Sequence, residues 1–192
     1  AFNDYHMGTT AENIACDYNI SRETMDDFAI ASLSKAVAAM ESGAFNDEIV
    51  PVTVSGRGGD SVVDADEQPP KAKPEKIPSL KPAFAKDGTV TAANSSSISD
   101  GASALVLASE SAAATAGATP IARIVAHASH AQLPAEFTLA PIGAINKVLD
   151  KAGWNLGDVD LFEINEAFAV VTLLAIQELG LDADKVNIHG GA

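Results

Sequence analysis

The sequence predicts an α/β fold in which strands and helices alternate along the chain. Hydrophobic residues make up 47% of the 192 residues, so the chain can bury a substantial core. In the second half, short apolar runs typical of buried strands alternate with amphipathic segments of helical spacing. The predicted strands are "ALVLAS" at 104–109, "IARIVAHA" at 121–128, "VDLFEI" at 159–164 and "VNI" at 186–188, with helices over 110–116, 140–152 and 166–179.

Two helices are predicted in the first half. Thr9 and Glu12 have the spacing of a capping box, and the apolar residues that follow them lie on one helical face, which predicts a helix over 10–18. Ser21 can cap a second helix, whose apolar residues keep helical spacing as far as Gly43.

A hairpin and a basic segment follow. The runs "EIVPVTV" and "SVVDAD" flank the Gly-rich "SGRGGD", which predicts two strands joined by a turn. Residues 71–86 then hold five of the 12 basic residues, and residues 69–82 hold five of the nine prolines. This extended, basic segment is equally consistent with a solvated loop and with an anion-binding site.

Charge and cysteine content exclude several classes of protein. The formal charge of -14 disfavours a nucleic-acid or anionic-membrane surface, and no apolar run reaches the roughly 18 residues of a membrane span. Cys16 is the single cysteine, so no internal disulfide is possible, and we expect a soluble, cytoplasmic protein in which Cys16 is a packing residue. The pair His127 and His130 lacks the partners of a metal site, and no metal is expected.

Two polar stretches carry the possible chemistry. Asn165 and Glu166 lie where a predicted strand meets a predicted helix, which is where ligands gather in α/β sheets. An asparagine there can serve an oxyanion hole, but the spacing alone favours Asn165 as a helix cap and Glu166 as a partner of the helix dipole. The loop "AANSSSISDG" at 92–101 is rich in hydroxyl groups and can contact a ligand or form a packed connection.

The two ends of the sequence favour a piece of a longer protein. The chain begins with Ala1 and ends on "VNIHGGA", a strand-like run with a turn signal and no continuation.

Five segments together resemble the thiolase family, most of all its acetyl-CoA acetyltransferases. They are "HMGTTAEN" at 6–13, "DEIVPV" at 47–52, "DGTVTAANSSSISDGASALVLAS" at 87–109, "INEAFA" at 164–169 and "VNIHGGA" at 186–192. Their order and spacing match over the whole chain. The resemblance implies the thiolase fold, two similar layered α/β halves with a loop domain inserted in the first, only partly covered by this chain.

The resemblance also implies a domain division and an activity. Residues 1–98 resemble the later part of the coenzyme A-binding loop domain, 99–118 the last strand and helix of the N-terminal half, and 119–192 the beginning of the C-terminal half. The implied reaction is the reversible condensation of two acetyl-CoA to acetoacetyl-CoA plus coenzyme A through an acyl-cysteine. These coenzyme A esters are substrates, so no cofactor is expected, and family members form homodimers or homotetramers.

Residue roles follow from the matching positions. Asn165 matches the family asparagine that holds a water in the oxyanion hole for the thioester oxygen. Lys71 lies in the basic segment where the family places positive charge near the coenzyme A phosphates, and Phe137 borders the acyl pocket, where a bulky side chain favours short substrates. The other matching substrate-binding positions are His6, Met7, Phe84, Ala92, Ser96, Ile98, Ala167 and Phe168.

Three family residues have no match in the chain. They are the acylated cysteine, the histidine of a Gly-His-Pro motif, for which His189 does not substitute because it precedes the Gly-Gly pair, and a second cysteine. We therefore expect the segment alone to be inactive. The alternative is a thiolase-like protein that binds acyl-CoA or assists assembly without catalysis.

Overall fold

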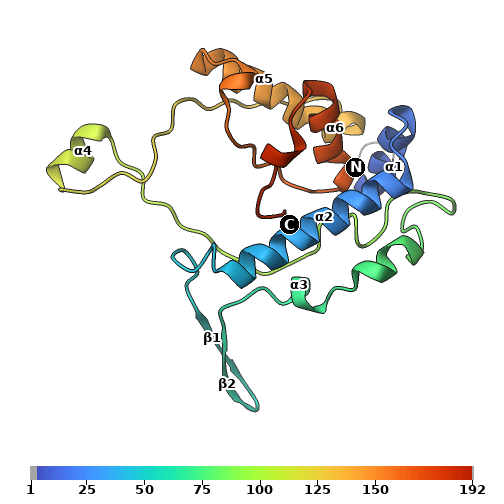
Figure 1. Cartoon of the computed structure of the whole chain (residues 1–192), viewed down its shortest axis with the longest axis horizontal. Coiled ribbons are helices and arrows are strands. Elements are labelled where there is room, and N and C mark those ends of the chain that lie inside the picture. The colour runs from blue at the N-terminus through green and yellow to red at the C-terminus, as the bar shows by residue number, and fades with distance from the viewer. Residues whose placement is uncertain (1–3, 192) are drawn as a thin grey trace.

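The computed structural model describes residues 4–191 and has a packed region, a projecting hairpin and a long extended excursion (Figure 1). The packed region contains the helices α1 (Met7–Asp17), α2 (Arg22–Ser42), α5 (Ala140–Ala152) and α6 (Ala169–Leu179). The hairpin and the excursion leave this region in different directions, so the buried residues concentrate around α6.

The two predicted N-terminal helices are confirmed, with one change of cap. Ser21 caps α2 by accepting a hydrogen bond from the Thr24 N–H, and Gly43 ends it in the left-handed conformation at φ 72°. The first helix starts earlier than predicted because His6, and not Thr9, is its N-cap. Glu12 therefore does not close a capping box, and its buried carboxylate instead reaches a distant loop.

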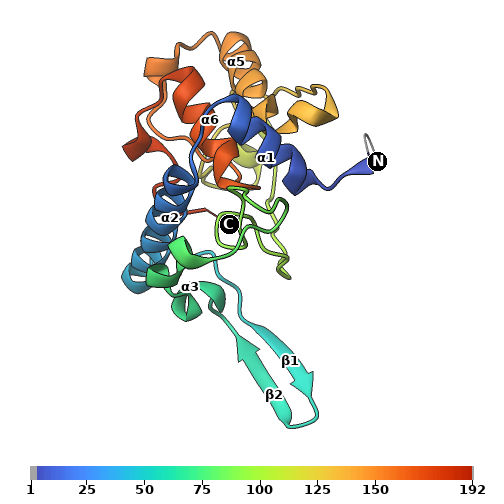
Figure 2. The same cartoon turned by 90° about the vertical axis from the view of Figure 1, so that its right-hand side faces the viewer.

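The predicted hairpin is confirmed as β1 (Val52–Gly56) and β2 (Gly59–Val63), which pair antiparallel. Figure 2 shows it standing away from the helices, and all ten of its residues are exposed. The basic segment contains a short helix α3 (Gln68–Lys71) and a 3₁₀ helix η2 (Pro74–Ser79). Arg22 ties this segment to α2 by donating to the carbonyl oxygens of Ile77, at 3.1 Å, and Leu80, at 2.9 Å.

The core forms where α6 packs between α1, α2 and α5. Val170 and Leu174 of α6 are fully buried, and Met25 of α2 is buried beside them in the same cluster. α5 is preceded by the 3₁₀ helix η3 (Pro134–Leu139), which also packs on α1 and α6. Shorter 3₁₀ turns, η4 (Leu156–Asp158) and η5 (Ala183–Lys185), connect the remaining segments. The predicted helix over 140–152 is thus confirmed.

The predictions of strands at 104–109 and 121–128 are wrong, because the described chain forms no strand there. Residues 104–109 and 121–128 are extended but pair with no strand among residues 4–191. Leu105, Val106 and Ile121 are at least 89% exposed, because no neighbouring strand or helix covers them. Between these segments, the predicted short helix is present as α4 (Glu110–Thr115).

The last two predicted strands are joined by a single isolated bridge and do not form a longer ladder. Phe162 pairs with Val186 in parallel, through hydrogen bonds from the Phe162 N–H to the Lys185 carbonyl, at 2.8 Å, and from the Asn187 N–H to the Phe162 carbonyl, at 2.9 Å. The helix expected over 166–179 begins later, at Ala169. In the described chain, no helix is both long and apolar enough to cross a membrane.

Candidate active site

Two loops distant in the sequence meet at the N-terminus of α6. Ser95 forms an antiparallel bridge with Phe168, the Ser96 N–H donates to the Ala167 carbonyl at 3.1 Å, and the Ala169 N–H donates to the Asn94 carbonyl at 2.9 Å. The two polar stretches that the sequence singled out therefore form one site. We call residues 91–96 the serine loop and residues 164–168 the asparagine turn.

Buried polar groups hold the serine loop, and the two residues that precede it, against the helices. Glu12 of α1 accepts hydrogen bonds from the N–H and the hydroxyl of Thr89, at 2.7 and 2.8 Å, and from the Val90 N–H at 2.9 Å. Asp26 of α2 accepts from Nδ2 of Asn94 at 3.0 Å and pairs with Arg22 at 2.6 Å. Because buried polar groups are costly unless they are paired, these contacts determine where the loop lies.

Four of the predicted site residues form a row of rings across the site. His6 stacks on Phe84 with centroids 4.9 Å apart, and Phe84 meets Phe168 edge to face at 6.4 Å. Phe168 in turn meets Phe137 at 6.3 Å. Gly8 allows this row because a Cβ at that position would run into the Phe84 ring. The row gives the site a continuous apolar side.

Asn165 lines a hollow of about 310 Å³ whose other side chains are mostly apolar. Phe137 and Ala167 line the same hollow, so it continues from the end of the aromatic row. Asn165 itself is exposed, and among residues 4–191 no hydrogen bond engages its side-chain amide. An amide with free donors and a free acceptor beside an apolar hollow can bind a carbonyl oxygen or a water.

The helix-cap explanation for the polar pair at 165–166 is wrong. The N-cap of α6 is Phe168, and its side chain makes no capping hydrogen bond. Glu166 lies two residues before that cap and is buried, with Oε2 2.8 Å from Oγ of Ser32 and Oε1 2.7 Å from Nδ2 of Asn187. The pair therefore has two environments, one polar side chain free and the next fully engaged.

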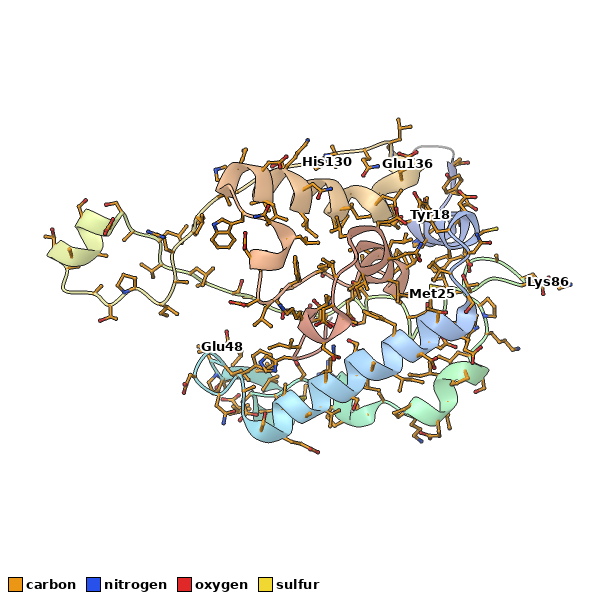
Figure 3. The ribbon with its side chains drawn as sticks, turned by 45° about the horizontal axis from the view of Figure 1, so that its top comes forward. Tyr18, Met25, Glu48, Lys86, His130 and Glu136 are labelled. Atoms are coloured by element: carbon orange, nitrogen blue, oxygen red, sulfur yellow. The ribbon has the colours of Figure 1, made fainter. Side chains whose placement is uncertain are left out.

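The remaining predicted site residues lie on the surface around this centre. Ala92 and Ser96 are exposed on the serine loop, and Met7 is 56% exposed at the start of α1. Ile98 is fully exposed just beyond the serine loop, on the extended segment. Lys71 pairs with Glu67 at 3.3 Å on α3, and no recorded contact within residues 4–191 joins it to the rings. Lys86, at the tip of its own loop, points into solvent (Figure 3).

Sequence reasoning missed the residues that support the site. Glu12, Asp26, Ser32 and Asn187 are all buried, but each is too common a residue to attract attention by itself. Glu12 carried one usable signal, because it lies on the helical face of α1 that also buries Ala11 and Ala15. Cys16, expected to pack, is exposed. No cluster of three His, Cys, Asp or Glu that could hold a metal occurs among the residues that the structure describes.

Comparison with known proteins identifies the family. The family model "Thiolase, N-terminal domain" matches residues 1–111, and "Thiolase, C-terminal domain" matches residues 118–192. The chain belongs to the thiolase family. This thiolase chain is 50% identical to an acetyl-CoA acetyltransferase of Paracoccus denitrificans and 51% identical to one of Escherichia coli. In both cases all of the chain aligns with 49% of the relative, so the chain spans about half the length of these curated relatives.

Solved structures confirm the thiolase fold. The Bacillus anthracis acetyl-CoA acetyltransferase superposes with a TM-score of 0.95 at 45% identity, over 99% of this chain and 48% of that one. The Acat5 thiolase from Ascaris suum, solved in complex with coenzyme A, gives a TM-score of 0.92 at 44% identity, over 98% of this chain and 48% of that one. The predicted α/β class is therefore correct, although the described residues form few of its strands.

Proposed function

We propose that this chain is part of an acetyl-CoA C-acetyltransferase. The enzyme would condense two acetyl-CoA to acetoacetyl-CoA plus coenzyme A, and would catalyse the reverse thiolysis, through an acyl-cysteine. The observation that carries the proposal is the free amide of Asn165 at an apolar hollow beside Phe137. Support comes from the names of the relatives, which are acetyl-CoA acetyltransferases in several bacteria.

Asn165 would act on the charge that develops at the thioester. When a nucleophile attacks a thioester carbonyl, the oxygen gains negative charge, and a positioned donor stabilises it most in the transition state. The amide of Asn165 would donate to that oxygen through a held water. The nucleophilic cysteine and the histidine and second cysteine of the family would come from outside this chain.

The substrate would lie along the aromatic row. Its pantetheine arm would contact His6, Phe84 and Phe168, with Ser96 and the exposed Ala92 beside it. The acyl end would face Phe137, whose ring limits the length of the acyl chain. Met7, Ile98 and Ala167 would line the remaining path. Lys71, on α3, would attract the phosphates of coenzyme A by long-range electrostatic attraction.

Domain roles and assembly belong to the same proposal. Residues 1–98 would complete the loop domain that receives coenzyme A, 99–118 would end the N-terminal half, and 119–192 would begin the C-terminal half. The switch between the two matching family models, between residues 111 and 118, supports the last boundary. We expect a cytoplasmic homodimer or homotetramer that needs no cofactor.

The test is thiolysis of acetoacetyl-CoA by the full-length protein that carries this chain. Loss of the enolate absorbance on adding coenzyme A should follow normal turnover in the wild type. Asn165→Ala should lower kcat by about 10²-fold, the usual cost of an oxyanion-hole donor. Asn13→Ala, a matched change at an exposed position of α1, should leave kcat unchanged.

The alternatives give different results in the same assay. The 192-residue chain alone should show no turnover, and activity near that of the full-length protein would contradict the proposed division of residues. A full-length protein that binds acetoacetyl-CoA tightly without turnover would be a thiolase-like binding protein, and the proposed activity would be wrong.

A further inference from the structure

The carboxylate of Glu166 is buried without a cation. Glu166 is only 8% exposed, and among the described residues no Lys, Arg or His lies within ion-pair distance of its carboxylate. The two oxygens instead accept hydrogen bonds from neutral groups, Oγ of Ser32 and Nδ2 of Asn187. A buried acidic group held this way is costly, so its neighbours must be placed accurately around it.

Asn187 fixes Ile164, the residue that precedes Asn165. Its Oδ1 accepts from the Ile164 N–H, and its Nδ2 donates to the Ile164 carbonyl, both at 2.8 Å. The same Nδ2 donates to Glu166 at 2.7 Å. Asn187 makes these contacts from a left-handed backbone, at φ 46°, which asparagine tolerates better than most residues. One side chain therefore holds both neighbours of Asn165.

Helix α2 anchors this arrangement. The Gly191 N–H donates to Oγ of Ser32 at 2.9 Å, so the Ser32 hydroxyl proton is left to point at Glu166. The chain can come this close because residues 190 and 191 are glycines. A Cβ on Gly190 would lie 2.8 Å from the backbone nitrogen of Ala36, and one on Gly191 would overlap the Glu166 carboxylate.

We propose that Ser32, Glu166 and Asn187 are positioning residues that set the place of Asn165 at the hollow. The inference rests on the proposed function, in which Asn165 has a catalytic role. The three side chains hold the backbone on both sides of Asn165 and leave its amide free to bind the water that would donate to the reacting oxygen. None of them lines the hollow, so they act on the chemistry only through Asn165.

This role affects turnover more than substrate binding. Within residues 4–191, Asn187 contacts none of the rings that would hold the pantetheine arm. His6 caps α1, Phe84 stacks on His6, and Phe168 is bridged to Ser95 of the serine loop. Displacement of Asn165 should therefore lower kcat while KM for coenzyme A stays close to the wild-type value. A small displacement of a catalytic group can reduce the rate by about 10²-fold.

The decisive variant is Asn187→Gly in the full-length protein. Glycine adopts the left-handed backbone without strain, so the change removes the side-chain contacts and not the turn. Asn19→Gly is the matched control, because Asn19 has φ 55° in the exposed turn between α1 and α2. We expect kcat to fall at least about tenfold for Asn187→Gly, with KM within about twofold of wild type, and no change for Asn19→Gly.

A second variant, Glu166→Gln, tests the proposal even if Asn187→Gly fails to fold. Glu166→Gln keeps the shape of the side chain but turns one hydrogen-bond acceptor into a donor that faces another donor. It should lower kcat in the same selective way. Equal kcat in wild type, Asn187→Gly and Glu166→Gln would overturn the proposal, as would parallel changes in kcat for Asn187→Gly and its Asn19→Gly control.

Failure of the proposed function is distinguishable from failure of this inference. If the wild-type protein shows no thiolysis, the proposed function is wrong. Hydrogen exchange of the peptide covering residues 161–168 then tests the positioning alone. Exchange should be at least about tenfold faster in Asn187→Gly and unchanged in Asn19→Gly, because the contacts that protect the turn are lost. Unchanged exchange in Asn187→Gly would refute the positioning role.

Discussion

Leu174 and Leu107 both lie in apolar segments but have opposite environments. Leu174 of α6 is fully buried, whereas Leu107 is 73% exposed. The first lies in the packed region, residues 7–42, 77–96 and 134–191, and the second lies in the extended region, residues 97–133. Apolar composition alone therefore does not determine burial in this chain, because a buried side chain also needs a second surface to cover it.

Polar contacts distinguish the two regions further. In the packed region, buried carboxylates bridge segments far apart in the sequence, as Glu12 does with Thr89 and Val90. In the extended region, the hydrogen bonds of α4 are local, as between Ser109 and Ala112. Long-range polar contacts and apolar burial thus occur together, since a carboxylate can be buried only where donors from another segment meet it.

The largest expected effect comes from leucine truncation in the 192-residue chain. Leu174→Ala should lower the free energy of unfolding by about 2 to 5 kcal/mol, because it leaves a cavity in the core. Leu107→Ala should lower it by less than about 0.5 kcal/mol, as for other exposed positions. Denaturant unfolding followed by circular dichroism measures both. Equal losses would mean that residue 107 is covered in solution.

Removal of a buried carboxylate should have the second-largest effect on the free energy of unfolding. Glu12→Ala leaves the N–H groups of Thr89 and Val90 without their acceptor, which should cost about 3 kcal/mol. Glu110→Ala, in exposed α4, is the control and should change the unfolding free energy by less than about 0.5 kcal/mol. The same denaturation experiment applies. A loss below about 1 kcal/mol for Glu12→Ala would show that Thr89 and Val90, which precede the serine loop, are held by other contacts.

Glycine substitution should have an intermediate effect. Gly8→Ala places a Cβ against the Phe84 ring and should cost about 1 to 3 kcal/mol through overpacking. Gly101→Ala in the extended region has no atom within 4 Å of the new Cβ, so its melting temperature should equal that of the wild type. If both variants melted alike, the stacking of His6 on Phe84 would not constrain residue 8.

The smallest expected effect is the loss of a helix cap. Ser21 accepts from the Thr24 N–H at 3.1 Å, and Ser109 accepts from the Ala112 N–H at 3.2 Å. Ser21→Ala should cost about 1 kcal/mol, the usual value for an N-cap. Ser109→Ala should not alter global unfolding, because α4 buries no residue. Thermal melts of the two variants should differ by several degrees, and coincident curves would contradict the distinction between the regions.

Local signals in the sequence predicted the helices but not all of the strands. Ser21 and Gly43 mark the ends of α2, because a cap and a left-handed glycine act within one helical turn. A strand needs a partner elsewhere, and no pattern within 104–109 says whether that partner is present. The predicted run there is extended but unpaired among residues 4–191.

The candidate site was predictable in its centre and not in its support. The family resemblance predicted His6, Phe84, Phe137 and Phe168, and the structure brings their rings into one row. Neither composition nor spacing indicated that Asn187 would hold Ile164 and Glu166, because this contact depends on how two distant turns dock. The catalytic role of Asn165 and the binding roles of the rings remain predictions.

The contact between Ser32 and Glu166 has a consequence for the order in which the protein is made. These residues are 134 positions apart, and Gly191, which donates to Ser32, is 159 positions away. During synthesis from the N-terminus, α2 emerges from the ribosome long before the segments that complete its polar face. Because contacts of such sequence separation form slowly, the asparagine turn should be among the last parts of the chain to become ordered.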